Sequence, residues 1–305
     1  MEFKHISVLL NEVISGLNIS PDGVYLDCTL GGAGHSSEIL KKLSSKGKLY
    51  GVDKDQDALD ASAEKLKNFK NVTFIKSDFK ELQDKLDQVK FDGILLDLGV
   101  SSHQIDTAER GFSFLKDAPL DMRMDKTQEL TAFDVVNTYS KQDLERILFE
   151  YGEEQFAKLI VRKIMEQRSI KPIQTTLELN ELIENTVPAK FKFKGASKKT
   201  FQALRIEVNG ELDGLGKTLE FLVSKLKKGG RIAVITFHSL EDRIVKHTFA
   251  KLEKACTCPP KTPICICGGK QIVKFVNKKP ITATEEELQN NMRSRSAKLR
   301  VVEKV

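Results

Sequence analysis

The fold is decided by one stretch, Val24-Tyr25-Leu26-Asp27-Cys28-Thr29-Leu30-Gly31-Gly32-Ala33-Gly34-His35. It predicts a short buried strand that runs into a glycine-rich turn, followed by a helix from Ser36 to about Leu43. Glycine has no Cβ, so its backbone can take a positive φ and a ligand can approach it closely. The first amides of the helix have no intrahelical partner and point at whatever binds there. The stretch therefore predicts the first βα unit of a nucleotide-type site.

The glycine pattern is incomplete. Gly32-Ala33-Gly34 supplies G-x-G, but Ser37 stands where the dinucleotide fingerprint has its third glycine. Taken alone, the stretch also fits an ordinary tight turn between a strand and a helix.

Strand-like and helix-like patterns alternate along the first hundred residues. Further strands are predicted at 49–53, 72–75 and 91–97, and a helix is predicted around 82–89. A fifth strand at 231–237 follows Gly229-Gly230, and late extended segments at 271–281 and 297–304 could complete the sheet edge. Repeated alternation with short connections favours a doubly wound parallel sheet.

The alternation stops between about His103 and Lys199. Apolar residues there recur at helical spacing, and Thr175 with Glu178 forms a capping-box pattern. A long helix is predicted at about 200–226. We therefore expect an inserted all-helical, substrate-recognition domain at 103–199, with the α/β core formed by residues 1–102 and 200–305.

The composition is that of a globular chain. Of 305 residues, 40% are hydrophobic and 30% charged, with a net charge of +6 that mildly favours polyanionic partners. The longest apolar stretches are too short to span a bilayer, and the N-terminus shows no apolar signal core. We expect a cytoplasmic protein that does not enter a membrane.

Three predicted strands end in acids: Asp53, Asp78 and Asp97. Ligands of open α/β sheets bind beyond the carboxyl ends of the strands. Asp53 follows Gly34 by 19 positions, close to the spacing of about 20 expected of a carboxylate that binds ribose hydroxyls. The alternative role for Asp53 is a helix N-cap, which Asp55 could supply equally well. Asp78 with Phe79 could hold an adenine, although core packing is the competing role for the ring.

Two adenosine cofactors fit these features, a nicotinamide dinucleotide and S-adenosylmethionine. The dinucleotide needs a pyrophosphate site, which usually has the full three-glycine turn. A sulfonium cofactor carries no phosphate and benefits from nearby acids. The strand-end acids therefore favour the methyl donor.

Several longer blocks resemble the bacterial ribosomal RNA small-subunit methyltransferase H family, also known as MraW, and together they span essentially the whole chain. The blocks are His5 with 8–12, then 96–102, 109–114, 119–125, 200–206, 236–243 and 295–300. The resemblance implies a Rossmann-like class I S-adenosylmethionine-dependent methyltransferase core with a helical insert. It also implies methylation of N4 of one cytidine in 16S rRNA, in the decoding region of the small ribosomal subunit.

The resemblance also implies particular contacts with S-adenosylmethionine. Matched position by position, the cofactor contacts fall on Ala33, Gly34, His35, Asp53, Phe79, Asp97 and Gln104. The residues themselves had not pointed to Gln104. No metal is predicted in this site.

Cytosine N4 is a weak nucleophile because its lone pair is conjugated with the ring. Holding N4 in line with the sulfonium methyl group is therefore expected to contribute most to catalysis. Asp97 is the natural candidate for the acceptor of the amine proton, although a cofactor role competes for it. His238 is predicted to shape the substrate side of the pocket. Ser239 is expected to be a helix N-cap, because no G-x-S-x-G elbow surrounds it.

The target base is expected to leave its stack and enter the pocket. Amino-group methyltransferases with an Asp/Asn-Pro-Pro-aromatic motif stack the base on its ring, but this chain has Asp97-Leu98-Gly99-Val100 there. His103, Phe112 and Phe114 are therefore candidates for base stacking, with core packing as the competing role for both phenylalanines.

Two basic segments are candidates for RNA contact: 190–201, where lysines and phenylalanines interleave, and the cluster Arg293, Arg295, Lys298 and Arg300. A solvated lysine face over core phenylalanines is the alternative for the first segment.

Four cysteines cluster late in the chain, at Cys256, Cys258, Cys265 and Cys267. They could hold structural zinc or remain free thiols. The sequence also leaves open a homodimer, a DNA or protein methyltransferase, and a non-catalytic RNA-binding factor that keeps the same core.

Overall fold

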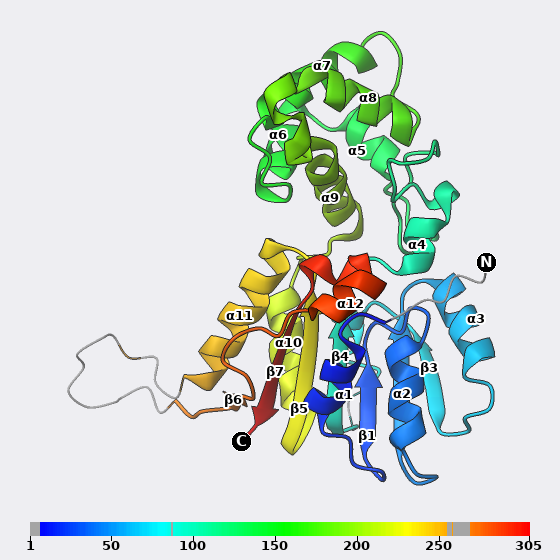
Figure 1. Ribbon diagram of the computed structural model, residues 1–305, viewed down its shortest axis with the longest axis vertical. Coiled ribbons are helices and arrows are strands. Elements are labelled where there is room, and N and C mark those ends of the chain that lie inside the picture. Colours follow the sequence, from blue (N-terminus) through cyan, green and yellow to red (C-terminus); the bar gives the residue numbers. More distant parts are fainter. Residues whose placement is uncertain (1–6, 87, 255–257, 259–268) are drawn as a thin grey trace. The chain divides into compact units, whose positions relative to one another are not determined.

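The computed structural model describes residues 7–86, 88–254, 258 and 269–305, without the side chains of residues 192–194. The chain forms two compact units (Figure 1). The first comprises Met1–Gly99 and Gly214–Val305, and the second comprises Val100–Asp213.

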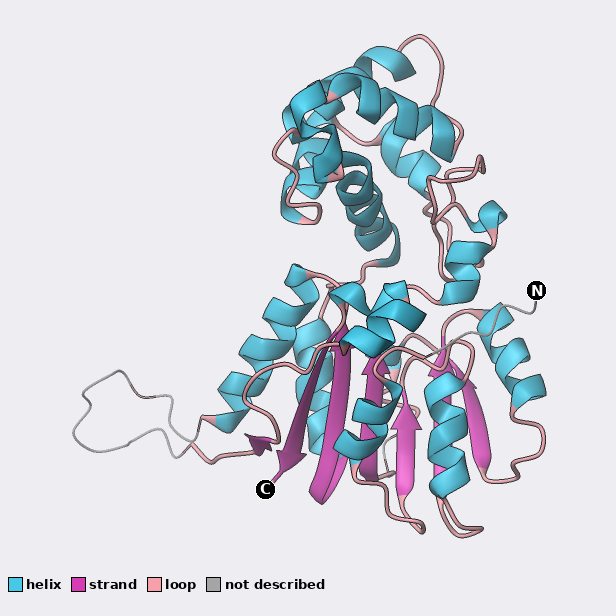
Figure 2. Cartoon of the chain, in the orientation of Figure 1, coloured by secondary structure: helices cyan, strands magenta, loops and turns pink. Residues whose placement is uncertain are grey.

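The first unit is built on a seven-stranded sheet among the described residues (Figure 2). Its parallel strands are β1 (Val24–Asp27), β2 (Lys48–Asp53), β3 (Val72–Lys76), β4 (Phe91–Asp97) and β5 (Leu226–Thr236). The late segments form β6 (Val273–Phe275) and β7 (Lys298–Lys304), and β7 runs antiparallel to both β5 and β6. The strand order is β3-β2-β1-β4-β5-β7-β6. This mixed α/β sheet, with the helical second unit described below, confirms the predicted fold class.

Helices cover both faces of this sheet, which explains why its central strands are continuously apolar. One face carries α1 (Leu10–Leu17), α2 (Gly34–Lys42) and α3 (Gln56–Lys65); the other carries α10 (Leu215–Lys225) and α11 (Ser239–Glu253). Alternate residues of one strand belong to opposite cores: Ile94 packs with the α10 and α11 side, and Leu95 with the α1 and α2 side.

The strand order reverses beside β1. This strand pairs with β2 on one side and with β4 on the other. Such a switch point opens a crevice at the carboxyl ends of the strands, where open α/β sheets bind ligands. The topology therefore puts the glycine-rich turn at the place where a ligand is expected.

Two predicted helices are wrong. The described residues of 82–89 form turns after the short 3₁₀ helix η1 (Phe79–Glu81). The helix predicted at 200–226 is two helices, α9 (Ala196–Asn209) and α10. Gly210 ends α9 with φ 55° and Gly214 precedes α10 with φ 66°. These left-handed positions favour glycine and stop a helix.

The second unit is helical. It contains α4 (Ser102–Asp106), η2 (Ala108–Arg110), α5 (Ala132–Thr138), α6 (Lys141–Glu150), α7 (Ala157–Arg168), α8 (Thr176–Thr186), η3 (Ala189–Lys194) and α9. The capping box of Thr175 and Glu178 forms at the start of α8, as predicted. Helix α9 packs against α5, α6 and α8, so the unit extends to Asp213 and beyond the predicted boundary at residue 199.

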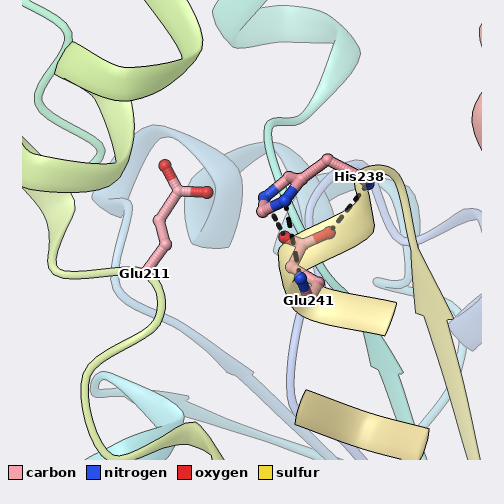
Figure 3. A group of neighbouring side chains, drawn as sticks. All are labelled: Glu211, His238 and Glu241. Carbon is pink, nitrogen blue, oxygen red and sulfur yellow. Dashed lines mark hydrogen bonds and ion pairs between the residues drawn. The ribbon is translucent and has the colours of Figure 1, made fainter. Parts of the chain in front are cut away.

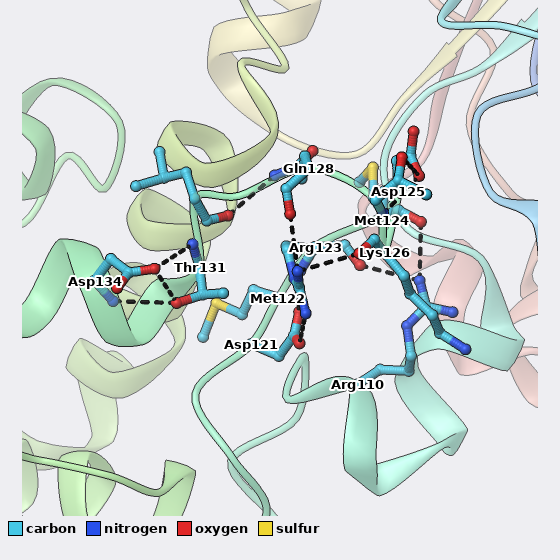
Figure 4. A network of polar contacts seen from close by, with 12 residues as sticks. Arg110, Asp121, Met122, Arg123, Met124, Asp125, Lys126, Gln128, Thr131 and Asp134 are labelled. Atoms are coloured by element: carbon cyan, nitrogen blue, oxygen red, sulfur yellow. Dashed lines mark hydrogen bonds and ion pairs between the residues drawn. The ribbon is translucent and has the colours of Figure 1, made fainter.

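Arginines fix the long segment between η2 and α5 (Figure 4). Arg123 donates to Asp121 through Nε at 3.0 Å and Nη2 at 2.8 Å, and through Nη1 to the carbonyl of Gln128 at 2.8 Å. Arg110 donates to the carbonyls of Arg123 and Met124. The block at 119–125 is thus held by its own polar contacts, in agreement with the lowered pKa of Asp121 beside Arg123.

None of the helices in the described part of the chain combines the length and apolar character that a membrane span requires.

Candidate active site

The glycine loop between β1 and α2 contains two residues in the left-handed region. Gly31 has φ 49° and Ala33 has φ 52°, and Ala33 is fully buried. This conformation costs a non-glycine residue about 1–2 kcal/mol, so the surrounding contacts must hold Ala33 there. Gly34 leaves room for Ser7: a Cβ at this position would lie 1.8 Å from Ser7 Oγ, so the Ser7 side chain would have to move. The positive φ expected from the sequence occurs at Gly31, and the close approach of a ligand to the loop stays a prediction.

Three contacts fix the backbone of this loop. The amide of Gly31 donates to Asp53 Oδ2 at 2.8 Å. Ser62 Oγ donates to the Gly31 carbonyl at 2.8 Å, and Lys65 Nζ donates to the Gly32 carbonyl at 2.7 Å. Since Ser62 and Lys65 belong to α3, the loop is tied both to the end of β2 and to the following helix.

Asp53 is already engaged by the backbone. Its Oδ2 accepts from Gly31, and its Oδ1 accepts from the amide of Asp55 at 2.9 Å. Asp55 caps α3 by accepting from the amide of Asp57 at 3.1 Å, so the capping role falls to Asp55. Burial raises the pKa of Asp53. A carboxylate oxygen can accept more than one hydrogen bond, which leaves capacity for ribose hydroxyls.

Asp97 ends β4 in an unusual environment. Its amide donates to Thr29 Oγ1 at 2.6 Å. Its Oδ1 is buried and has no hydrogen-bond partner among the described residues. Burial, followed by the nearby carboxyls of Asp27 and Glu241, raises the pKa of Asp97 to about 8. A cation placed beside this carboxyl group would favour its ionised form.

His35 lies next to Asp97. Its Nε2 donates to the Val8 carbonyl at 2.9 Å, so this nitrogen carries a proton. Its Nδ1 lies 3.7 Å from Asp97 Oδ2, which is too far for a direct hydrogen bond. The imidazole is 6% exposed and therefore forms part of the protein wall of the site.

Asp27 is a further candidate site residue, which the sequence analysis missed. It ends β1, is 1% exposed, and accepts from Ser36 Oγ at 2.7 Å and from the amide of Thr29 at 3.1 Å. Burial raises its pKa to about 6. Its position in the sequence could have identified it, because Asp27 ends a strand, as Asp53 and Asp97 do, and lies just before the glycine loop.

Asp78 and Phe79 follow β3. Asp78 caps η1 and lies near two ammonium groups, Lys54 Nζ at 3.6 Å and Lys80 Nζ at 3.5 Å. Phe79 is half-buried against the core. Their roles in adenine binding stay predictions.

His238 begins α11 (Figure 3). The amide of Glu241 donates to His238 Nδ1 at 3.5 Å, and the carboxylate of Glu241 accepts from the amides of Phe237 at 2.9 Å and His238 at 3.4 Å. The N-cap is therefore His238, and the prediction that Ser239 caps the helix is wrong. Glu241 Oε1 lies 3.2 Å from His238 Nε2, but this buried nitrogen has no hydrogen-bond partner among the described residues.

Two other residues belong to the second unit. Gln104 is buried and forms a reciprocal capping box with Ser101, in which its Oε1 accepts from the Ser101 amide at 3.0 Å. Glu211, also drawn in Figure 3, accepts from Arg205 Nε at 2.8 Å and Nη2 at 2.9 Å. The contact of Gln104 with the cofactor stays a prediction.

The stacking candidates differ in exposure. Phe112 and Phe114 are half-buried against the core of the second unit, and the ring of Phe114 meets that of Phe201 edge-to-face at 5.1 Å. His103 is exposed. Phe201, in the first basic segment, is 4% exposed and belongs to the core.

The second basic cluster divides into internal and external residues. Arg300 is 5% exposed and its Nε donates to Asp242 Oδ1 at 2.7 Å, while Lys298 Nζ lies 3.3 Å from Asp242 Oδ2. The prediction that Arg300 faces RNA is therefore wrong. Arg293 and Arg295 are exposed.

Other predicted features cannot be placed. The side chains of Lys192 and Lys194 lie outside those described, as do Cys256, Cys265 and Cys267. Cys258 is partly buried, and zinc binding by the four cysteines stays a prediction.

The residues at the carboxyl edge fit a cationic cofactor without phosphates. Asp27, Asp53 and Asp97 would repel a pyrophosphate, whereas they would attract an ammonium or sulfonium group. The buried Oδ1 of Asp97 has no hydrogen-bond partner among the described residues, so it is able to accept a hydrogen bond from a ligand. The donor set therefore favours S-adenosylmethionine over a nicotinamide dinucleotide.

Comparison with known proteins agrees with this site chemistry. A model of the MraW methylase family matches residues 2–305. The chain belongs to the MraW methylase family. It is thus an S-adenosylmethionine-dependent methyltransferase, and the predicted family and cofactor are confirmed.

Relatives match over their full length. Two curated relatives, from the Kyoto and Loch Maree strains of Clostridium botulinum, are each 56% identical over 309 residues, covering 100% of both chains. Both are named ribosomal RNA small subunit methyltransferase H. Among solved structures, an rRNA methylase from Streptococcus thermophilus has a TM-score of 0.40 at 12% identity, covering 97% of this chain and 92% of that one.

Replacing Asp97 with Asn should stabilise the cofactor-free protein at high pH. The folded protein holds the Asp97 proton up to about pH 8, whereas an unfolded aspartate releases it near pH 4. Between these values the folded state binds more protons, so the wild-type free energy of unfolding falls as pH rises. The melting temperature of Asp97→Asn should exceed that of the wild type by several degrees at pH 8 and by much less at pH 5.

The exposed Asp84 provides the control. Asp84→Asn should melt like the wild type at both pH values. An Asp97→Asn effect that is equal at pH 5 and pH 8 would contradict the proposed burial of an uncompensated acid.

Proposed function

We propose that the protein transfers the methyl group of S-adenosylmethionine to N4 of a specific cytidine in the decoding region of 16S rRNA, within the small ribosomal subunit. The observation that carries the rRNA assignment is the 56% identity, over the whole chain, to relatives named ribosomal RNA small subunit methyltransferase H. The choice of cytidine N4 rests on the resemblance described above and on the chemistry of Asp97.

Methylation of an exocyclic amine requires an acceptor for a proton. S-adenosylmethionine, when bound, supplies an electrophilic methyl group and leaves as S-adenosylhomocysteine. The amine nitrogen forms the new N–C bond and loses one proton. Asp97 accepts that proton in its ionised form, which the positive charge of the bound cofactor favours, and its Oδ1 has no hydrogen-bond partner among the described residues.

His238 supports the substrate side of the proposed pocket. It stands directly after β5, beside the strand that ends in Asp97. The hydrogen bond from the Glu241 amide occupies Nδ1, so in this arrangement the ring is better placed to orient a base than to take its proton. We therefore assign proton acceptance to Asp97 and a positioning role to His238.

The exposed part of the second basic cluster is a proposed RNA contact. Because β7 is antiparallel, its first residue, Lys298, pairs with Thr236 at the carboxyl end of β5. The preceding η4 (Met292–Ser296) therefore lies at the same edge of the sheet as the acids of the site. Arg293, Arg295 and Met292, which is 66% exposed, project from it. The two arginines could bind RNA phosphates, and the exposed methionine could pack against an unpaired base.

The reaction is tested by incubating the protein with labelled S-adenosylmethionine and small subunits lacking the modification. Nuclease digestion and mass spectrometry should yield N4-methylcytidine from one position of 16S rRNA. The Asp97→Asn variant should lose most of this product. Methylation of a different atom, or of DNA or protein instead, would overturn the proposal.

Charge reversal at Arg295 should weaken RNA binding but not cofactor binding. Each lost phosphate contact lowers the slope of log affinity against log salt by about one. Arg295→Glu should therefore bind a 16S rRNA fragment several-fold more weakly and with a shallower salt dependence, measured by filter binding. Lys48→Glu, which reverses an exposed charge at the first residue of β2 and thus at the opposite edge, is the control. Equal salt slopes for Arg295→Glu and the wild type would remove η4 from the interface.

A further inference from the structure

The segment Ser7–Leu9 lies directly on the glycine loop. A Cβ at Gly34 would come within 1.8 Å of Ser7 Oγ. The Val8 carbonyl accepts the hydrogen bond from His35 Nε2 at 2.9 Å. Two of the residues assigned to the cofactor site therefore depend on the position of this N-terminal segment.

The backbone of the segment turns sharply at Leu9. This residue has φ 52° and ψ 37° and is fully buried. A left-handed conformation at a buried leucine persists only where its surroundings enforce it. Because the turn at Leu9 sets the direction of the Val8 carbonyl, whatever holds Leu9 also aims the acceptor of the His35 hydrogen bond.

The group that holds Leu9 comes from the other end of the chain. The amide of Leu9 donates to Glu287 Oε1 at 2.8 Å, across 278 positions of sequence. Glu287 lies in the first turn of α12 (Glu285–Asn290), which is capped by Thr284. A buried amide without an acceptor is costly, so Glu287 satisfies a group that the turn at Leu9 would otherwise leave unpaired.

The position of α12 is itself fixed. Shortly before it, Ile281 exchanges hydrogen bonds with Leu299 of β7 at 2.9 and 2.8 Å. Helix α12 is therefore anchored to the edge of the sheet, and Figure 1 shows it near the carboxyl ends of the strands. A fixed helix can hold the N-terminal segment against the loop.

We propose that Glu287 is a positioning residue for cofactor binding, which acts through the Leu9 amide and the Val8 carbonyl to orient His35 beside Asp97. The inference rests on the assignment of the Gly31–His35 loop and Asp97 to S-adenosylmethionine. Glu287 itself need not touch the cofactor. Without Glu287, the Ser7–Leu9 segment and His35 should become more mobile. Cofactor binding would then have to order them, which lowers the affinity.

The test compares three substitutions at Glu287. Glu287→Ala removes the acceptor, Glu287→Asp withdraws it by one methylene while keeping the charge, and Glu287→Gln keeps an acceptor oxygen in place. Affinity for S-adenosylmethionine, measured by calorimetry, should fall about tenfold in Glu287→Ala, fall less in Glu287→Asp, and stay near the wild-type value in Glu287→Gln. Glu286→Ala, an exposed neighbour on α12, is the control and should bind normally.

Steady-state kinetics separate positioning from general damage. The KM for S-adenosylmethionine should rise in Glu287→Ala, while kcat at saturating cofactor and the KM for RNA should change little. If the wild type binds the cofactor and both Glu287→Ala and Glu287→Asp bind it equally well, the inference is overturned. Failure of the wild type to bind S-adenosylmethionine would overturn the cofactor assignment together with the inference.

Discussion

Three carboxyl groups, Asp27, Asp53 and Asp97, lie at the carboxyl edge of the sheet around the glycine loop. Burial disfavours their ionised forms, and repulsion from neighbouring carboxylates adds to this effect. The pKa of Asp27 is raised to about 6 and that of Asp97 to about 8. In the free protein these carboxyl groups are therefore either protonated or ionised at a cost in free energy. A positively charged ligand would stabilise the ionised carboxylates and remove this cost.

The rest of the first unit serves to keep this arrangement in place. Parallel pairing of β1 with β2 and β4 brings the strand ends together. The loop is then held by Asp53 from β2, by Ser62 and Lys65 from α3, and by the N-terminal segment that Glu287 fixes. A glycine loop alone would be mobile. These contacts convert it into a preformed surface, which lowers the cost of ordering on binding.

The local features of this site could be predicted from sequence, whereas the long-range contacts could not. The strand–turn–helix of 24–43, the cap at Asp55 and the capping box at Thr175 follow from patterns a few residues long, and all form as expected. The helix at 82–89 failed because a helical apolar spacing over eight residues is too short to ensure a helix without tertiary support. Gly210 and Gly214 indicated a break between α9 and α10, but the prediction of one long helix followed the apolar spacing on either side of them. Glu287 pairs with an amide 278 positions away, and no local pattern marks it.

The most direct test of the account is the number of protons released when S-adenosylmethionine binds. Calorimetric titration at pH 7 in two buffers of different ionisation enthalpy yields this number. Asp97, whose side chain is 25% exposed and whose pKa is raised to about 8 in the free protein, should lose its proton to the buffer as the cationic cofactor binds. We expect a net release approaching one proton, reduced in the Asp97→Asn variant. Binding without proton release, or with release unchanged in the variant, would contradict the claim that uncompensated buried acids select this cofactor.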